Sequence, residues 1–231
     1  MEINKISKNK LKYLVKLKHK KYIKEENKFI IEGTHLINEA INAGKKVEVY
    51  SLEGLEQKEI KQLTNLESPT EIIGVVDTFS NNELKGKRFL LLDEIQDPGN
   101  LGTIIRSALA FNVETVVLGD NTCSLYNEKV LRSTQGAIFH INIINMNLEE
   151  CIKKLKEQDI IVYGTNVVNG TDLKSISKTS SYALCMGNEG NGLSKKIQDM
   201  CDKNIYIKTN DLSESLNVAM ATSIILYELD K

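Results

Sequence analysis

Hydrophobic and polar positions follow different patterns in the two parts of the chain. In the first part, residues 33–43 place their apolar side chains on one helical face and are followed by Gly44, which predicts an amphipathic helix. We expect a second helix over residues 58–66, a basic helical arm over residues 7–22, and strands over residues 28–31, 47–52 and 71–78. These elements predict a small α/β domain over residues 1–80.

In the second part of the chain, short apolar runs alternate with helical segments. The runs FLLL and TVVL are apolar at almost every position, which is typical of a parallel sheet covered on both faces. We expect strands over residues 88–92, 115–118, 160–164, 182–186 and 204–207. We expect helices over residues 100–111, 148–158, 194–200 and 215–229. The sequence therefore predicts an α/β domain with a parallel sheet over residues 88–231, after a polar linker over residues 81–87.

Composition narrows the classes of protein that the chain can belong to. Of its 231 residues, 41% are hydrophobic, which is enough to build a core. No apolar run is long enough to span a bilayer, and the N-terminus lacks the apolar region of a signal peptide, so we expect a soluble cytoplasmic protein. The four cysteines form no CxxC pair and are not spaced with the histidines as metal ligands, so we expect no metal site.

The basic residues are unevenly distributed. The net charge is −1, but residues 1–28 hold ten lysines and three acidic residues, a local charge near +7. Such a segment can bind RNA phosphates, although a solvated lysine face explains it equally well. Only three of the 30 basic residues are arginines: Arg88, Arg106 and Arg132. An arginine kept in a lysine-rich chain is either a chance occurrence or needed for its planar guanidinium.

Three segments carry candidate chemistry, and the first is LLDEIQDPGNLGTIIRSALAFN, residues 91–112. A strand ends at Asp93, and a Pro-Gly turn then leads to Asn100 and a helix. We expect Asn100 to cap this helix. Arg106 lies six residues later and is not on the same face by the usual spacing of three or four. A simple cap and a surface charge are the structural alternatives for these two residues.

The second segment is ALCMGNEGNGLS, residues 183–194, in which an apolar strand runs into a glycine-rich loop. We expect Gly187, Gly190 and Gly192 to permit positive φ angles and a close approach of the backbone to a ligand. Their order, GxxGxG, differs from the GxGxxG of dinucleotide sites, and no GK[ST] of a P-loop is present. Glu189 suits a cationic partner better than a phosphate. A strained connecting loop is the alternative.

The third segment is IYIKTNDLSESLNVAMATSIILYEL, residues 205–229, which passes from a strand through a polar loop to a helix. We expect Ser215 to be the N-cap of this helix. Asn217 then falls in the first turn, where a simple helix former would cost less. An ordinary capped helix explains Ser215 well and Asn217 poorly.

Together these segments resemble the three motifs of the SpoU (TrmH-like) branch of the SPOUT RNA methyltransferases. The matching pieces are DPGNLGTIIRSA, MGNEGNGLS and SLNVAMA, in this order. KVLRSTQGAIFHI, residues 129–141, also resembles this family, and IEGTHLINEAINAG, residues 31–44, resembles its N-terminal substrate-binding domain. The resemblance covers almost the whole chain. It implies a deep trefoil knot in the parallel sheet, a first domain similar to ribosomal protein L30e, and a homodimer.

The resemblance also implies an activity, the transfer of a methyl group from S-adenosylmethionine to a ribose 2′-hydroxyl. Arg106 matches the family's catalytic arginine, and the polar set around it matches Asn100, Glu189, Ser215 and Asn217. Because a guanidinium stays protonated in proteins, we expect Arg106 to bind phosphate and to stabilise negative charge on the 2′-oxygen. Glu189 is expected to hold Arg106 or the glycine-rich loop in place.

The cofactor positions implied by the resemblance lie in the same motifs. Gly187, Ile207 and Leu216 are expected to frame S-adenosylmethionine, with Asn188, Gly190 and Asn217 near it and Thr165 and Asn166 in the facing loop. One departure is Lys208-Thr209, where many relatives have Pro-Met. We therefore expect a different shape for the loop over residues 210–214, and with it a different choice of substrate.

The expected partner is structured RNA, recognised by its shape, its unstacked loops and its 2′-hydroxyl groups. The first domain favours 23S ribosomal RNA, and transfer RNA is the alternative substrate. A catalytically silent RNA-binding protein is a second hypothesis, which the presence of Arg106, Glu189 and Asn217 disfavours. A nucleotide-binding oxidoreductase is a third, which the glycine spacing disfavours.

Overall fold

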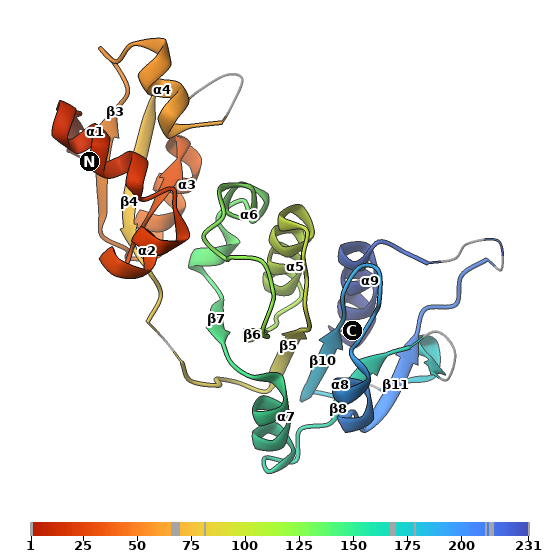
Figure 1. The fold of residues 1–231 in the computed structure, drawn as a ribbon. Helices are drawn as coiled ribbons and strands as arrows, with labels where there is room; N and C mark the ends of the chain where they lie inside the picture. The colour runs from red at the N-terminus through yellow and green to blue at the C-terminus, as the bar shows by residue number, and fades with distance from the viewer. Residues whose placement is uncertain are drawn as a thin grey trace. The chain divides into compact units, whose positions relative to one another are not determined.

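The computed structural model describes the chain except for residues 1, 66–69, 81, 167–169, 178, 211, 213–214 and 231. Its contacts form two compact units (Figure 1). Unit 1 consists of Met1–Ser80 and Ser124–Phe139, and unit 2 of Asn81–Cys123 and His140–Lys231. The sequence assigned residues 124–139 to the second domain, whereas the contacts group them with the first 80 residues. Residue 66, the last of the expected helix over 58–66, lies outside the described residues. So does residue 81, the first of the expected linker over 81–87.

Unit 1 is built on a four-stranded sheet in the order β1-β3-β4-β2. The β1 and β3 strands pair in parallel, and β4 pairs antiparallel with both β3 and β2. The strands are β1 (Ile3–Lys5), β2 (Lys28–Glu32), β3 (Val47–Ser51) and β4 (Ile72–Asp77). The helices are α1 (Lys8–Lys16), α2 (Lys20–Glu26), α3 (Gly33–Asn42), α4 (Gln57–Leu63), α6 (Glu128–Ser133) and the short 3₁₀ helix Ala137–Phe139.

The basic N-terminal segment is part of the folded core of unit 1. The expected single helix over residues 7–22 is instead two helices, because the chain turns after Leu17 and His19 adopts an extended conformation. Leu11, Leu14 and Leu17 are spaced three apart and are buried in the cluster that also contains Tyr50. Burial of this apolar face holds the helices in place and leaves lysines on their outer side.

Unit 2 contains a seven-stranded sheet in the order β7-β6-β5-β10-β8-β11-β9, in which all the pairs found among the described residues are parallel. The strands are β5 (Arg88–Leu92), β6 (Thr115–Leu118), β7 (Asn142–Asn145), β8 (Val162–Thr165), β9 (Thr171–Asp172), β10 (Tyr182–Met186) and β11 (Lys203–Tyr206). The helices are α5 (Pro98–Ala110), α7 (Leu148–Lys156), α8 (Lys195–Met200), α9 (Val218–Asp230) and the 3₁₀ helix Leu173–Ser175. The predicted α/β class with a parallel sheet is confirmed.

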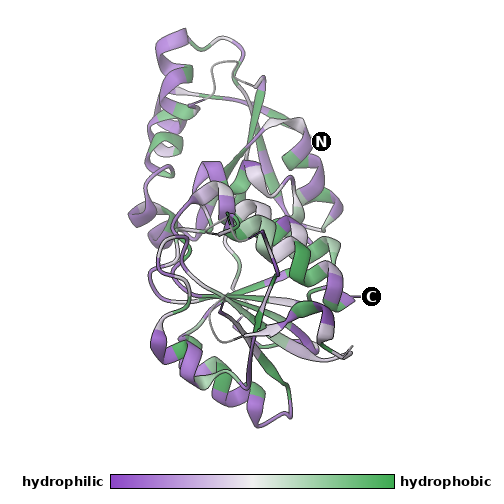
Figure 2. Ribbon diagram, turned by 90° about the vertical axis from the view of Figure 1, so that its right-hand side faces the viewer, coloured by the Kyte–Doolittle hydropathy of each residue, from purple (hydrophilic) through white to green (hydrophobic). Residues whose placement is uncertain are grey.

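Apolar strands form the centre of unit 2. The β5 and β10 strands are buried neighbours, with Cys185 opposite Leu91. Helices α7 and α8 pack together over one face of the sheet, and α5 packs with α9 over the other (Figure 1). Figure 2 shows the hydrophobic residues concentrated along the strands and the hydrophilic ones on the outer turns of the helices. Sheets buried on both faces in this way need strands without polar alternation.

Parallel pairing decides where the three motifs meet. The carboxyl ends of neighbouring parallel strands lie at one edge of the sheet, and ligands bind in the loops beyond that edge. The loops that follow β5, β10 and β8 therefore emerge side by side, and β11 pairs with β8 next to them. No helix among the described residues is long and apolar enough to cross a membrane.

Candidate active site

The first turn of α5 differs from the sequence prediction. Asp97, not Asn100, is the N-cap, and its side chain accepts a hydrogen bond of 2.9 Å from the Asn100 backbone N–H. Pro98 occupies the first helical position, where its lack of an N–H costs nothing and its fixed φ suits the helix. The carboxylate of Asp97 also interacts favourably with the positive end of the helix dipole. The predicted cap at Asn100 is therefore wrong, and its side chain is free for other contacts.

Glu189, in the glycine-rich loop, holds the loop that follows β5. Its carboxylate accepts hydrogen bonds of 3.1 Å each from the backbone N–H groups of Gln96 and Asp97 and from Nδ2 of Asn100. Partial burial raises the pKa of Glu189, but the hydrogen bonds from Asn100 and the backbone outweigh it and keep the pKa below its ordinary value. Glu189 is thus a carboxylate at neutral pH that fixes residues 96–100.

Asn217 connects the third motif to this network. Its Nδ2 donates a hydrogen bond of 3.0 Å to Oδ1 of Asn100, and its Oδ1 accepts hydrogen bonds of 2.9 and 3.2 Å from the backbone N–H groups of Ala219 and Met220. Asn217 is therefore the cap of α9, which begins at Val218. The predicted cap at Ser215 is wrong, because that residue lies exposed in the loop before the helix. Capping explains the asparagine that the sequence left unexplained.

Asn188 closes the glycine-rich loop on itself. Its backbone exchanges two hydrogen bonds with Gly192, of 3.0 and 2.9 Å. Its Oδ1 accepts hydrogen bonds from the backbone N–H groups of Gly190 (2.9 Å) and Asn191 (3.1 Å), and its Nδ2 donates to the carbonyl of Glu94 (2.9 Å). The side chain of Asn188 thus both stabilises the turn of the loop and joins the loop to the end of β5.

The three glycines of this loop have different structural roles. Among them only Gly192 has a positive φ, +70°, so the expectation of positive φ angles at Gly187 and Gly190 is wrong. A Cβ atom at Gly187 would lie 2.1 Å from the carbonyl carbon of Gly192 and 2.1 Å from the Leu193 nitrogen, whereas one at Gly190 would meet nothing closer than 3.6 Å. Gly187 is therefore required by the close approach of the chain to itself.

The remaining predicted cofactor positions lie on neighbouring strand ends. Thr165, the last residue of β8, donates through Oγ1 to the carbonyl of Cys185 at 3.3 Å, and the Asn166 N–H donates to the Ile205 carbonyl at 3.1 Å. Ile207 follows β11 and is half-buried, and Leu216 is 36% exposed just before α9. Of the loop over residues 210–214, positions 211, 213 and 214 lie outside the described residues.

Arg106 lies on α5, six residues after Asn100, and is exposed. It forms no hydrogen bond or ion pair with the part of the chain that the structure describes. By contrast, Arg88 pairs with Asp230, and Arg132, in unit 1, is half-buried with its Nη1 closed off from solvent. Arg106 is therefore the arginine whose guanidinium is available to a ligand, and no described contact joins it to Glu189.

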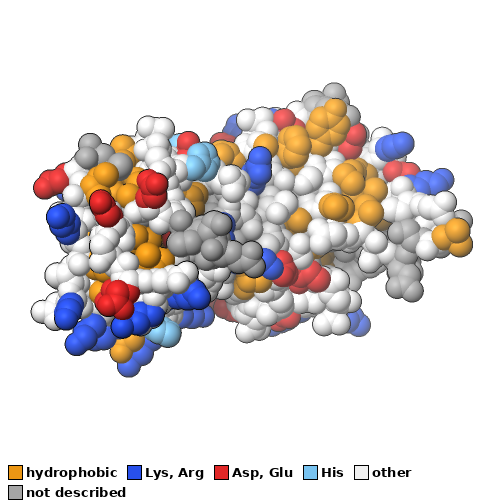
Figure 3. All heavy atoms as spheres, turned by 90° about the horizontal axis from the view of Figure 1, so that it is seen from above, with side chains coloured by type: hydrophobic (Ala, Val, Ile, Leu, Met, Phe, Trp, Pro, Cys, Tyr) orange, Lys and Arg blue, Asp and Glu red, His pale blue; other side chains and the backbone are white. Residues whose placement is uncertain are grey.

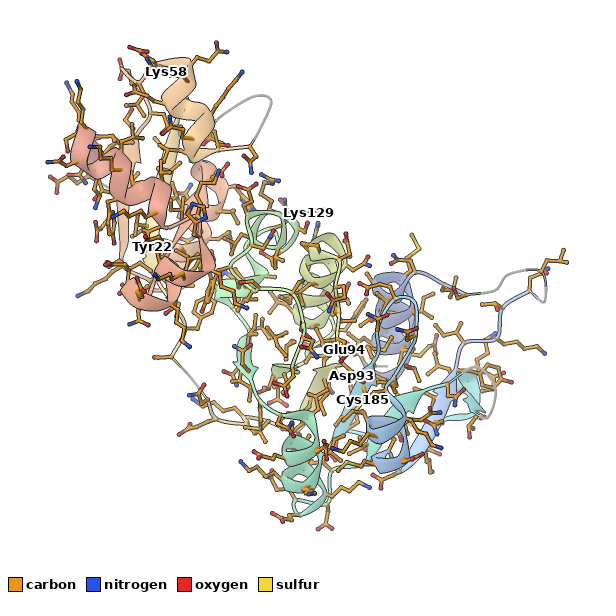
Figure 4. The ribbon with its side chains drawn as sticks, viewed as in Figure 1. Tyr22, Lys58, Asp93, Glu94, Lys129 and Cys185 are labelled. Carbon is orange, nitrogen blue, oxygen red and sulfur yellow. The ribbon has the colours of Figure 1, made fainter. Side chains whose placement is uncertain are left out.

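Asp93 is a site residue that the motif analysis mentioned only as the end of a strand. It is 8% exposed, its Oδ2 accepts a hydrogen bond of 2.8 Å from the Ser194 N–H, and its own N–H donates to the Met186 carbonyl. Figure 4 shows Asp93 and Glu94 at the end of β5, near Cys185 of β10. An aspartate directly after an apolar strand is the signal that identifies it. No group of three potential ligands that could hold a metal is found in the described part of the chain.

The fold and the site together define an α/β protein whose polar loops meet at the carboxyl edge of a parallel sheet. The profile of the SpoU rRNA Methylase family matches residues 87–227, and that of the MRM3-like substrate binding domain matches residues 8–79. The chain therefore belongs to the SpoU rRNA Methylase family. The resemblance predicted from the three motifs is confirmed.

Similar proteins agree with this assignment. The 23S rRNA (guanosine(2553)-2′-O)-methyltransferase RlmP of Bacillus subtilis (strain 168) is 35% identical over 99% of this chain and 98% of its own length. The AdoMet-bound rRNA methyltransferase of Sinorhizobium meliloti is 27% identical, with a TM-score of 0.87 over 98% of this chain and 97% of that chain. AviRb from Streptomyces viridochromogenes, in complex with AdoMet, is 22% identical, and its TM-score of 0.87 over 97% of each chain supports the fold alone.

Proposed function

We propose that this chain transfers the methyl group of S-adenosylmethionine to a ribose 2′-hydroxyl in 23S ribosomal RNA. The observation that carries the proposal is the hydrogen-bonded series Glu189–Asn100–Asn217, which ties all three family motifs into one polar site. An RNA-binding protein without activity would not need these side chains to be oriented. The similarity to RlmP over nearly the full length of both chains supports 23S ribosomal RNA as the substrate.

The loops at the carboxyl edge of the sheet fit the cofactor. Backbone groups of Gly187, Ile207 and Leu216 would hold it. Gly187 follows β10 and Ile207 follows β11 at the carboxyl edge of the sheet, and Leu216 lies just before α9. Asn188, Gly190 and Asn217 would lie near it, and Thr165 and Asn166 would form the facing loop. At Gly187 the backbone of Gly192 and Leu193 comes so close that no Cβ atom fits. When bound, S-adenosylmethionine supplies a methyl group already activated on a sulfonium.

Arg106 is proposed as the residue that acts on the RNA. Its guanidinium stays charged, is exposed, and has no partner among the described residues, so it can bind a phosphate next to the reacting ribose. From there it would stabilise the negative charge that develops on the 2′-oxygen. Asn100, Ser215 and Asn217 would contact the same nucleotide, and Glu189 would keep Asn100 in position. Alignment of the bound groups would supply much of the remaining rate.

Unit 1 would dock the RNA backbone through α1 and α2. The exposed lysines of these helices are Lys8, Lys12, Lys16, Lys20, Lys21 and Lys24. Figure 3 shows basic side chains gathered along one edge of unit 1, at the lower left. Neutralisation of phosphates by such a face releases counterions and makes binding dependent on salt. Fixed to a folded core, these lysines would present charge at defined positions.

We also propose that the chain acts as a homodimer. Met220, Ile224 and Tyr227 are spaced three or four apart on α9 and are 63%, 40% and 52% exposed. Apolar side chains are visible on the surface of unit 2 in Figure 3. An apolar helix face of this kind suits the self-complementary interface of a two-fold dimer. The trefoil knot, the likeness of unit 1 to ribosomal protein L30e and the cytoplasmic location stay predictions.

The test of the proposed function is the transfer of radiolabelled methyl groups from S-adenosylmethionine to unmodified ribosomal RNA and, separately, to bulk transfer RNA. Nucleoside analysis of the product should place the label in a 2′-O-methylnucleoside of 23S RNA. Label in transfer RNA alone would mean that transfer RNA, not 23S RNA, is the substrate, while the proposed reaction would stand. A protein that binds RNA but neither binds the cofactor nor transfers label would be a silent RNA-binding protein.

A further inference from the structure

Glu94, the second residue after β5, has an unusual backbone conformation (it is labelled in Figure 4). Its φ of +58° lies in the left-handed region, which residues with long side chains rarely adopt. Glycine adopts this conformation without steric cost, and asparagine and aspartate tolerate it because their short side chains bond to the nearby backbone. Strain of this kind persists at functional sites, where the surrounding contacts hold it. A glutamate where glycine would cost less therefore indicates that its side chain is used.

The side chain of Glu94 binds the loop that follows β6, residues 119–123. Its Oε1 accepts a hydrogen bond of 3.1 Å from Nδ2 of Asn121. Asn121 also has a left-handed conformation, with a φ of +62°, so this bond joins two strained turns. Gln96 adds a second link, because its Nε2 donates a hydrogen bond to the Asn121 carbonyl. The loop over residues 119–123 is thus attached to the loop over residues 93–97 by two side chains.

The main chain of Glu94 binds the glycine-rich loop. Its carbonyl oxygen accepts a hydrogen bond of 2.9 Å from Nδ2 of Asn188. The backbone N–H groups of Gln96 and Asp97, which come next along the chain, donate to the carboxylate of Glu189. Because the left-handed turn sets the direction of the backbone after Glu94, it decides whether these groups reach their partners. Glu94 therefore lies where the loops that follow β5, β6 and β10 are joined.

Other left-handed residues of unit 2 have simpler explanations. Apart from glycines, the described residues of this unit with a positive φ are Glu94, Asn112, Asn121 and Asp159. Asp159, with a φ of +57°, is exposed between α7 and β8, and its side chain forms no hydrogen bond or ion pair with the described part of the chain. Glu94 is the one long side chain among these four, and it lies at the edge of the sheet where the motifs meet.

We propose that Glu94 is a positioning residue for methyl transfer. Its bond to Asn121 holds the left-handed turn before α5, and this turn keeps Asn100 and Glu189 in the arrangement that receives the RNA nucleotide. The loop over residues 119–123 becomes part of the site through this bond, although it lies outside the three family motifs. The inference rests on the proposed function, since the groups that Glu94 positions act on the RNA.

Two variants of Glu94 separate the hydrogen bond from the backbone conformation. Glu94→Gly suits the left-handed φ, so the melting temperature should change little, whereas kcat should fall about tenfold, the scale of one lost hydrogen bond to a charged group. Glu94→Gln keeps an oxygen that accepts from Asn121 and should recover most of the activity. The KM for RNA should stay constant in both variants, because Glu94 acts through other residues. A wild-type kcat in Glu94→Gly, or an equal loss in Glu94→Gln, would overturn the proposal.

Asn121→Gly breaks the same hydrogen bond from the other side and also suits a left-handed φ. It should lower kcat by the same factor, and it tests the proposal even if Glu94→Gly is unstable. The double variant should be no slower than either single variant, because all three lack the same interaction. Losses that multiply would mean that the two residues act separately, which would overturn the proposal. Asp159→Gly is the matched control and should leave kcat unchanged.

Hydrogen exchange of the protein without RNA separates this inference from the proposed function. The backbone N–H groups of Gln96 and Asp97, protected by Glu189, should exchange about tenfold faster in Glu94→Gly and at the wild-type rate in Asp159→Gly. An inactive wild-type protein that shows this difference would contradict the proposed function and support the positioning role. An active wild-type protein with unchanged exchange and unchanged kcat in Glu94→Gly would overturn the positioning role alone.

Discussion

Asn217 donates a hydrogen bond of 3.0 Å to Asn100, and these two residues lie 117 positions apart in the chain. Each amide has a second fixed contact, Asn100 with Glu189 and Asn217 with the first turn of α9. An asparagine held at both ends has a defined orientation of its oxygen and nitrogen atoms. The site is therefore organised by its own hydrogen bonds before any ligand binds, which is the condition for efficient electrostatic catalysis.

Substitution of Glu189 should disturb this organisation. In Glu189→Gln the charge that accepts three hydrogen bonds is lost, and the new amide group points N–H donors at other donors. We expect a loss of about 1.5–3 kcal/mol in the interactions that hold residues 96–100, and at least a tenfold fall in methyl transfer. Thermal melting and single-turnover rates measure these effects. Glu157→Gln, at an exposed position, should change neither, and an unaltered rate in Glu189→Gln would mean that the network is not needed for activity.

Arg106→Ala should lower methyl transfer about 10²–10³-fold, the usual effect of removing one group that stabilises a developing oxyanion. The side chain is exposed and unpaired among the described residues, so the melting temperature and the affinity for S-adenosylmethionine should not change. Arg106→Lys should recover little activity, because an ammonium cannot reproduce the bidentate geometry of a guanidinium. Thr103→Ala, at an exposed position on the same helix, is the control. Near-normal turnover in Arg106→Ala would remove this residue from the mechanism.

Gly187→Ala and Gly190→Ala form a matched pair in one loop. The new methyl group at position 187 would lie 2.1 Å from backbone atoms, so the turn must open, at a cost of about 1–3 kcal/mol. The methyl group at position 190 would have no contact closer than 3.6 Å. Isothermal titration with S-adenosylmethionine should show binding weakened at least tenfold in the first variant and nearly unchanged in the second. Equal affinities would place the cofactor away from this loop.

Removal of charge from α2 should weaken RNA binding. Lys20→Gln with Lys21→Gln removes two adjacent exposed lysines, and the slope of log K against log salt should become less steep by about 0.7–0.9 for each lost phosphate contact. Lys153→Gln with Lys154→Gln is the equivalent pair on α7 and should leave the slope unchanged. Lys18 is left intact because it lies beside Glu128. An unchanged slope in the α2 variant would mean that its lysines only face solvent.

Acid should destabilise unit 1 through Glu48. Hydrogen bonds from Tyr50 and Lys28 lower the pKa of Glu48 to about 2, with Lys10 adding to the effect. Because the folded pKa lies below the value of about 4.3 for a free glutamate, this contribution to stability is present at neutral pH and is lost as the pH falls from about 5 toward 2. Urea unfolding should show Glu48→Gln less stable than the wild type at pH 7, with the difference shrinking by pH 3. A constant difference at all pH values would exclude this linkage.

Much of the fold follows from local patterns in the sequence. The runs at residues 88–92 and 182–186 coincide with β5 and β10, because a strand buried on both faces is built almost entirely of apolar residues. Short elements with mixed composition, such as β7 with its two terminal asparagines, gave no such signal and were missed. The loops of the site could also be predicted from local patterns, because each family motif is a short run of neighbouring residues rich in glycine and asparagine.

The sequence by itself determined the α/β class, the family and the set of residues to consider. Only the tertiary structure decided which atoms meet: Asp97 and Asn217 are the helix caps, and Glu189 binds residues 96–100 across about 90 positions of chain. It also decided that residues 124–139 complete unit 1. The physical reason is the sequence separation over which each effect acts. Hydrophobic periodicity and helix propensity depend on residues only a few positions apart. A hydrogen bond or a cavity between distant segments exists only after the sheets have brought those segments together.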